Sequence, residues 1–262
     1  MLELSLTRIF SVVFYYHFAF LAISIALFGL GAGGVLSYVA VPKDGNIFRR
    51  LGLLSAGTCC ATLLALVFVL TRTELNNWTL GIIYFTTALP FVLAGSIVSL
   101  AISETIERVD RVYFFDLIGA AAGCLLLVPF LNFFGGPNTV LVAAVLFAVA
   151  SAIWFNLGSS IRGRAAGVAL ALAMVAIIAL NLKQPAFIDV KFAKGQALRN
   201  ELFVKWNSFS RIALAPEKNS GMMMIYIDAD ASTGIANFDF ANLPERERMD
   251  LAREGPGFPY QV

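Results

Sequence analysis

Long runs of apolar residues dominate the first 182 residues and limit what this chain can fold into. Six runs approach the ~20 residues that an α-helix needs to cross the ~30 Å hydrocarbon core of a bilayer. They cover residues 9–41, 51–70, 80–103, 113–134, 139–157 and 165–182. The sequence therefore predicts an all-α polytopic membrane bundle of about six spans, with the lipid bilayer as its partner.

Two local features divide these runs. The first run is longer than one span requires and contains Tyr15, Tyr16 and His17. We expect a helix to end near these residues and a full span to follow them to about Tyr38. The Gly-Gly-Pro-Asn sequence at 135–138 is typical of a tight turn, so we expect a hairpin between the fourth and fifth runs.

The distribution of charge separates two parts of the chain. Only 16 of the first 182 residues are charged, against 20 of the last 80, which is the ~25% of a soluble protein. We therefore expect a transmembrane helical domain at 1–182 and a soluble, β-rich segment at 183–262. Its strand candidates are 202–206, 211–214 and 222–228. A net charge of +2 without a basic run argues against nucleic-acid binding.

Four ionisable residues of the membrane part are candidate functional residues: Glu3, Arg8, His17 and Asp116. An ionised side chain inside a bilayer is costly, and it marks a possible functional site for that reason. The alternatives are structural. Asp116 would then lie at the interface, paired with Arg111 or Arg8, Glu3 would pair with Arg8, and His17 would be a packed or interfacial residue.

In the tail, Arg211, Asp228 and Asp230 form a second candidate site. The two carboxylates flank Ala229 at the end of a predicted strand, where they could bind a cation or an amine. The alternative is a turn that ends the strand, stabilised by hydrogen bonds from the aspartate side chains.

Metal and nucleophilic sites are not expected. A zinc site needs about four nitrogen or sulfur ligands, and the chain has one histidine and three cysteines without a CxxC motif. Because His17 lies in the membrane part, a Ser/His/Asp triad is excluded as well. We assign no catalytic, cofactor-binding or metal-binding residue.

Glycines repeat at helical spacing in two of the apolar runs. Gly29, Gly31 and Gly34 match a G-x-G-x-x-G pattern, but that motif binds dinucleotides only between a strand and a helix. Inside an apolar helix, as with Gly119 and Gly123, small residues indicate close helix packing within the bundle or between copies. These faces make a homo-oligomer possible.

Several sequence blocks follow the pattern of one family. In the membrane part they are 3–11, 16–20, 29–34, 89–91, 94–95 and 113–123, and in the tail 205–212 and 227–231. The most specific are Tyr-Phe-Phe-Asp-Leu-Ile-Gly-Ala at 113–120 and Trp-Asn-Ser-Phe-Ser-Arg at 206–211. In these blocks the chain resembles spermidine synthase-like multi-pass membrane proteins of the aminopropyltransferase family.

The resemblance implies an S-adenosylmethionine-type Rossmann domain after the β-rich segment. Nothing after Asp230 matches its Gly-rich turn, the acidic catalytic motif is missing, and Phe209-Ser210 lacks the glutamine of the Tyr-Gln or Phe-Gln pair of soluble spermidine synthases. We therefore expect a catalytically incomplete fragment, with S-adenosylmethionine or its decarboxylated form bound only by a full-length protein. The alternatives are a small-molecule transporter or channel, with Asp116 and His17 in the path, or a membrane anchor or oligomerisation module without chemistry.

Orientation in the cell's inner membrane rests on two opposing arguments. The loops on one side of a six-span bundle hold Lys43, Arg49, Arg50, Arg108, Arg111, Arg162 and Arg164. The other side holds Arg8 and Arg72, to which the nearby tail adds Lys183, Lys191, Lys194 and Arg199. The short loops alone place the tail outside the cytoplasm. The resemblance implies a cofactor from the cytosolic pool, and on that ground we expect a cytoplasmic tail.

Overall fold

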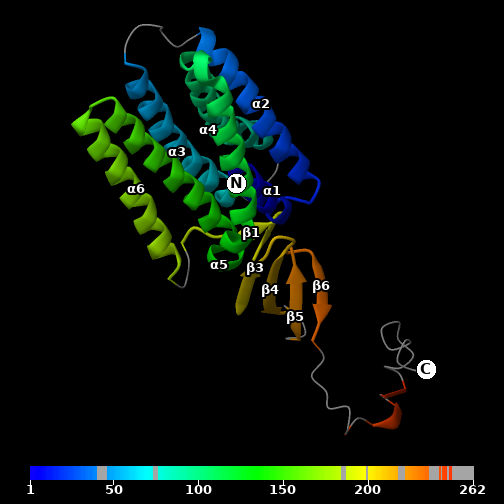
Figure 1. The fold of residues 1–262 in the computed structure, drawn as a ribbon. Coiled ribbons are helices and arrows are strands. Elements are labelled where there is room, and N and C mark those ends of the chain that lie inside the picture. Colours follow the sequence, from blue (N-terminus) through cyan, green and yellow to red (C-terminus); the bar gives the residue numbers. More distant parts are fainter. Residues whose placement is uncertain are drawn as a thin grey trace.

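The apolar runs form a bundle of helices, and the tail forms strands at one end of it, as Figure 1 shows in this computed structural model. The structure describes residues 1–39, 46–72, 76–183, 187–198, 200–217, 222–235, 242, 244–246 and 248–249. Over this part of the chain the helices are α1 (Leu2–Val13), α2 (Phe18–Val39), α3 (Ile47–Thr71), α4 (Asn77–Glu104), η1 (Ile106–Arg108), α5 (Val109–Leu157) and α6 (Ile161–Asn181).

Five of these helices, α2 to α6, are long and apolar enough to cross a membrane. The chain is therefore a multi-pass membrane protein by length and composition, but the predicted count of six separate spans is corrected to five. The predicted spans 113–134 and 139–157 both lie in the 49-residue α5. The expected break near Tyr15 to His17 is confirmed, because α1 ends at Val13 and α2 begins at Phe18.

The helix α5 bends sharply at Gly135, inside the turn sequence at 135–138. Gly135 has φ 78° and ψ 171°, a backbone conformation that a side chain with a Cβ rarely adopts. Pro137 follows within the first turn of the second limb, where a missing N–H costs no helical hydrogen bond. At ~1.5 Å per residue, the limbs 109–134 and 136–157 are each more than ~30 Å long.

The second limb of α5 runs away from the strands. Gly136, at its start, lies against Trp206 of the tail, where an added Cβ would meet the ring at 2.8 Å. At its far end, Phe155 lies 2.9 Å from the position of a Cβ on Gly52, near the start of α3. The strands and the first turn of α3 therefore lie at opposite ends of the bundle.

Some of the glycines allow helices to approach closely, as expected for small residues in a membrane bundle. A Cβ on Gly29 would lie 2.5 Å from Cβ of Phe91 in α4, and one on Gly33 would overlap the carbonyl oxygen of Val92. Gly31 and Gly34 have nothing within 4 Å of a Cβ, so their side of α2 is open. Only part of the predicted glycine pattern thus serves packing inside the bundle.

The tail holds a two-stranded hairpin and a four-stranded antiparallel sheet. The strands are β1 (Phe192–Ala193), β2 (Gln196–Ala197), β3 (Phe203–Trp206), β4 (Arg211–Pro216), β5 (Met223–Ile227) and β6 (Ala231–Gly234). Strands β3, β4 and β5 confirm the three strand candidates, whereas β1, β2 and β6 are additional. In the β3–β4 pairing Trp206 lies opposite Arg211. This end of the sheet is the one nearest the helices, because Trp206 packs on Gly136 of α5.

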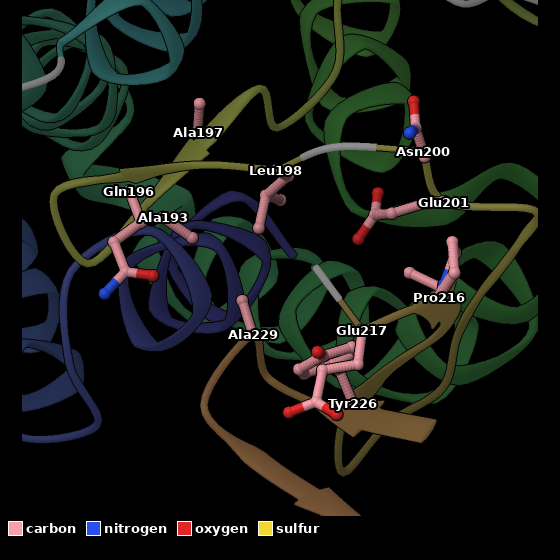
Figure 2. A pocket seen from close by; sticks show the side chains of 11 residues that line it. Ala193, Gln196, Ala197, Leu198, Asn200, Glu201, Pro216, Glu217, Tyr226 and Ala229 are labelled. Carbon is pink, nitrogen blue, oxygen red and sulfur yellow. The ribbon is translucent and has the colours of Figure 1, made fainter. Parts of the chain in front are cut away.

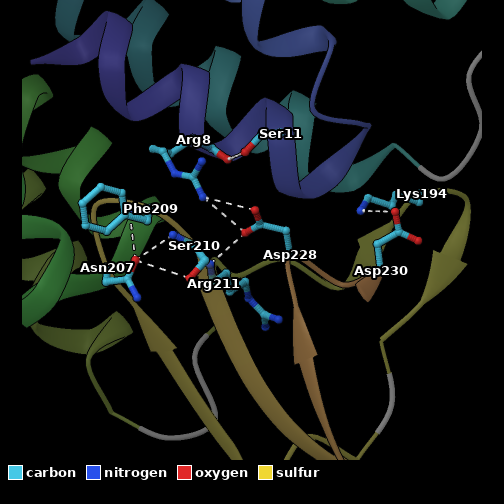
Figure 3. Close-up of polar contacts among 9 residues, drawn as sticks. All are labelled: Arg8, Ser11, Lys194, Asn207, Phe209, Ser210, Arg211, Asp228 and Asp230. Atoms are coloured by element: carbon cyan, nitrogen blue, oxygen red, sulfur yellow. Dashed lines mark hydrogen bonds and ion pairs between the residues drawn. The ribbon is translucent and has the colours of Figure 1, made fainter. Parts of the chain in front are cut away.

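The short helix α1 lies between the bundle and this sheet. Ile9 and Phe10 are fully buried in the hydrophobic core that the helices share. On the other side of α1, Arg8 and Ser11 lie toward the ends of the strands (Figure 3). Helix α1 thus joins an apolar surface to a polar one, and the candidate site is built around its polar side.

Candidate functional site

Arg8 and Asp228 join the membrane helices to the sheet. The guanidinium of Arg8 lies 3.2 Å from Oδ1 of Asp228, although the two residues are 220 positions apart in the sequence. The same carboxylate oxygen accepts a 2.8 Å hydrogen bond from the backbone N–H of Arg211 (Figure 3). Asp228 and Ala229 both have positive φ, 51° and 57°, in the turn after β5. One aspartate therefore holds α1, β4 and this turn together.

Arg211, the first residue of β4, is completely buried. Its guanidinium donates two hydrogen bonds, of 2.7 and 2.6 Å, to the two carboxylate oxygens of Glu201, and it lies 5.9 Å from the centre of the Trp206 ring. Such a two-point arginine–carboxylate contact fixes the relative orientation of both groups. Within the described residues the Nε atoms of Arg8 and Arg211 make no hydrogen bond. The arrangement suits structural support, since every charge is held by the protein's own groups.

A third ion pair joins the small hairpin to the turn after β5. Nζ of Lys194 lies 3.1 Å from Oδ2 of Asp230, and the same ammonium lies 5.8 Å from the centre of the Tyr15 ring. The backbone N–H of Lys194 donates a 2.7 Å hydrogen bond to the carbonyl oxygen of Val13, the last residue of α1. The two aspartates of the predicted tail site thus face cations of the chain itself.

Two asparagines fix the chain as it leaves α6. Asn181 donates to Oδ1 of Asn138 at 2.8 Å and to the carbonyl oxygen of Ile188 at 2.9 Å, and it accepts a 2.7 Å hydrogen bond from the backbone N–H of Ile188. Both asparagines are buried. Neither asparagine, nor Glu201, is among the candidate residues predicted from the sequence. The only sequence signal for the two asparagines is an amide side chain at the end of an apolar run.

Asp189 lies in this junction, beside a cavity of about 210 Å³ that is also lined by Asn138, Asn181 and Trp206. Burial raises the pKa of the Asp189 carboxyl, and the hydrogen bond from the backbone N–H of Val190 and the charge of Arg211 oppose that effect. This carboxyl is therefore held in an environment that disfavours its ionised form.

A larger cavity, of about 510 Å³, lies within the tail and is shown in Figure 2. Its polar lining includes Glu201, Glu217 and Tyr226, with Gln196 and Asn200 beside them, and no lysine or arginine lines it among the described residues. Oxygen acceptors predominate, so the cavity favours a hydrogen-bond donor or a cation over an anion. Glu201 already serves Arg211, which reduces its capacity for a further cation.

The intramembrane candidates do not come together. Asp116 is exposed on the first limb of α5, and within the described residues it makes no ion pair with Arg111 or Arg8. Arg8 binds Asp228, and no pair with Glu3 is present in this part of the chain. His17 is exposed in the connection between α1 and α2, where its ring stacks on Tyr15 at 5.7 Å.

Over the described ranges no group of three or more histidine, cysteine, aspartate or glutamate side chains could hold a metal ion. The glycines of the G-x-G-x-x-G pattern lie inside helix α2 rather than between a strand and a helix. Comparisons with protein-family models, with curated proteins and with solved structures found no match for this chain.

Proposed function

We propose that this chain is the membrane-embedded part of a spermidine synthase-like protein, and that it holds the β-rich start of an aminopropyltransferase-like domain against one membrane face. The observation that carries the proposal is the ion pair between Arg8 and Asp228. It joins block 3–11 to block 227–231, two of the blocks on which the resemblance rests, across 220 positions of sequence.

The contacts around that pair support a fixed position of the sheet rather than a flexible tether. Lys194 is bonded to the end of α1 through its backbone, Asn181 holds the segment that leads to β1, and Trp206 packs on the bend of α5. A domain that only needs to be near a membrane requires a linker and no such contacts. Their number and their polar character favour a positioning role.

The chemistry of the proposed family is not assigned to the described residues. S-adenosylmethionine sites use a Gly-rich turn between a strand and a helix, where backbone N–H groups meet the ligand. The described strands form antiparallel pairs without such a unit, so the residues here do not fit that cofactor. We accordingly assign no transfer step to this chain and infer that it is catalytically incomplete.

A transporter or channel is the competing proposal, and it would need polar residues along a common path. Asp116 and His17 lie at separate exposed surfaces, one on α5 and one between α1 and α2. We therefore favour the positioning role. The open sides of Gly31, Gly34 and Gly119 remain the surfaces that we propose for a homo-oligomer.

We propose that the protein lies in the cell's inner membrane with its tail in the cytoplasm. The arginines at the end of the bundle opposite the sheet, such as Arg49, Arg108 and Arg162, argue for the reverse orientation. The proposed family uses a cofactor from the cytosol, and this argues for a cytoplasmic tail. Two reporters fused after Val262, one active only in the cytoplasm and one active only in the periplasm, decide between the two orientations. A silent cytoplasmic reporter together with an active periplasmic one would reject a cytoplasmic tail.

The positioning role is tested by a disulfide across the junction. Tyr15→Cys with Lys194→Cys, in a protein whose native cysteines are replaced by alanine, should cross-link in intact membranes because the two side chains face each other, with Nζ of Lys194 5.8 Å from the centre of the Tyr15 ring. Tyr15→Cys with Lys205→Cys is the control, because Lys205 is exposed on the sheet. Proteolytic fragments should stay joined until reduction only in the first variant, and equal behaviour of the two would reject a fixed sheet.

Binding of the proposed family's cofactor is tested separately on the purified chain. Calorimetric titration with S-adenosylmethionine, and with its decarboxylated form, should give no binding heat, because the described residues lack the required turn. Measurable binding would show that the cofactor site lies within this chain and would overturn our inference that the chain is catalytically incomplete.

A further inference from the structure

Phe209 stands at the tip of the β3–β4 hairpin and is 84% exposed. The turn beneath it is well defined. Oδ1 of Asn207 accepts hydrogen bonds from the backbone N–H groups of Phe209 at 2.7 Å and of Ser210 at 2.6 Å, and the N–H of Asn207 donates to the carbonyl oxygen of Ser210 at 2.9 Å. An apolar ring is therefore held outward by a fixed turn, which requires an explanation in terms of what it contacts.

Both strands of the hairpin contact the membrane helices close to its tip. Trp206, at the end of β3, packs on Gly135 and Gly136 at the bend of α5. Arg211, at the start of β4, is joined through Asp228 to Arg8 of α1. Figure 3 shows the Phe209 ring on the side of the hairpin that faces α5. The tip thus lies at the membrane end of the sheet and not at its distal end.

The helices carry other highly exposed aromatic residues at the same end of the bundle. Tyr16 precedes α2, Trp78 is in the first turn of α4, and Phe133 lies two residues before the bend of α5; they are 79%, 85% and 80% exposed. Aromatic side chains gather at the boundary between headgroups and acyl chains, where a ring has both apolar and polar neighbours. These three residues indicate where that boundary lies at this end of the bundle, and Phe209 lies at the same end.

We infer that the β3–β4 hairpin inserts Phe209 into the headgroup layer of the bilayer, so that the sheet is itself a peripheral membrane element. The partner is the lipid interface. Two exposed lysines, Lys183 after α6 and Lys205 on β3, lie near the same end and can bind lipid phosphates. The inference concerns the surface of the hairpin and does not depend on the transferase proposal.

Depth-dependent quenching tests the inference. Phe209→Cys is made in a protein with Cys59, Cys60 and Cys124 replaced by alanine, is labelled with an environment-sensitive fluorophore and is reconstituted into phosphatidylcholine vesicles. A fraction of the lipid carries a spin label near its headgroup. The matched control is Phe203→Cys, since Phe203 is also an exposed aromatic residue but lies at the other end of β3.

The label at 209 should show a blue-shifted emission and a loss of intensity with spin-labelled lipid, whereas the label at 203 should be quenched by aqueous iodide instead. Equal quenching at the two positions, whether strong or weak, would overturn the inference. Monodisperse elution of both variants in detergent establishes that both are folded. As a second measurement, Phe209→Trp in the otherwise unchanged protein should gain quenching by brominated phosphatidylcholine relative to the parent, and no gain would count against insertion.

Discussion

The fully buried Arg211 gives the sharpest stability prediction. Glu201→Ala removes both acceptors of its guanidinium and leaves a buried positive charge without a partner. Breaking a buried ion pair on one side costs ~3–5 kcal/mol. The Glu201 side chain is 17% exposed, so water can reach the guanidinium in part, and we expect the lower end of that range, ~3 kcal/mol. Because ~1.4 kcal/mol is a factor of ten, local opening of the sheet should increase by ~150-fold.

Hydrogen exchange measured by mass spectrometry on the protein in detergent or nanodiscs reports this opening. Backbone amides in the β3–β4 pairing, such as those of Lys205 and Ile212, should lose protection, while amides within α3 should not change. The control is the double variant Glu201→Leu with Arg211→Met. Replacing a buried ion pair by apolar side chains of similar volume is often neutral, so this variant should regain protection.

Two results would refute the reasoning. Unchanged exchange in Glu201→Ala would mean that Arg211 is solvated or finds another acceptor, contrary to its complete burial. If amides in the double variant exchanged as fast as those in Glu201→Ala, the sheet would depend on the shape of the Glu201 side chain and not on its charge.

Three further predictions concern the bundle and its junction with the tail. Gly33→Ala should lower the melting temperature in detergent, since its Cβ would overlap the carbonyl oxygen of Val92, whereas Gly34→Ala, with free space around it, should not; equal melting temperatures would contradict the packing. Asn181→Ala removes three hydrogen bonds at ~1 kcal/mol each, so limited proteolysis near Ile188 should accelerate, and an unaltered rate would argue against this anchor. Burial raises the pKa of Asp189 above its ordinary 3.8, so its contribution to stability is complete below that pH and is lost as the pH rises through the folded-state pKa. Asp189→Asn should therefore stabilise the junction near neutral pH and have little effect in acid, and a stability difference from the parent that is independent of pH would refute this assignment.

Much of the helical part could be predicted because apolar run length is a local property of the sequence. The break at Tyr15 to His17 interrupts such a run with polar atoms, and the strands β3 to β5 follow turn residues. The predicted number of six separate spans was wrong, because the length of an apolar run does not show whether the next run follows after a loop or after a bend. At Gly135 the chain changes direction through one residue with positive φ, so the two apolar runs form two limbs of α5 that meet at a bend without an intervening loop.

The junction was harder to predict, because its partners are distant in the sequence. Asp228 could be recognised as a carboxylate at a strand end, but its cation comes from Arg8 in the first helix. Asn181 carries no signal beyond an amide at the end of a span, and its hydrogen-bond partners are an asparagine 43 positions earlier and a backbone group in the tail. Ionisable side chains can be found by type, whereas their pairing depends on the fold.

The change in composition near residue 182 is consequently not a boundary of the folded core. Val190, Ala193 and Trp206 of the tail belong to the same buried cluster as Ile9 and Phe10 of α1. A tail without the helices would expose these apolar side chains, and helices without the tail would leave the charge of Arg8 without Asp228. Both losses oppose independent folding, because apolar burial and ion-pair formation are satisfied only together. The sheet and the helices should accordingly stabilise each other at their junction.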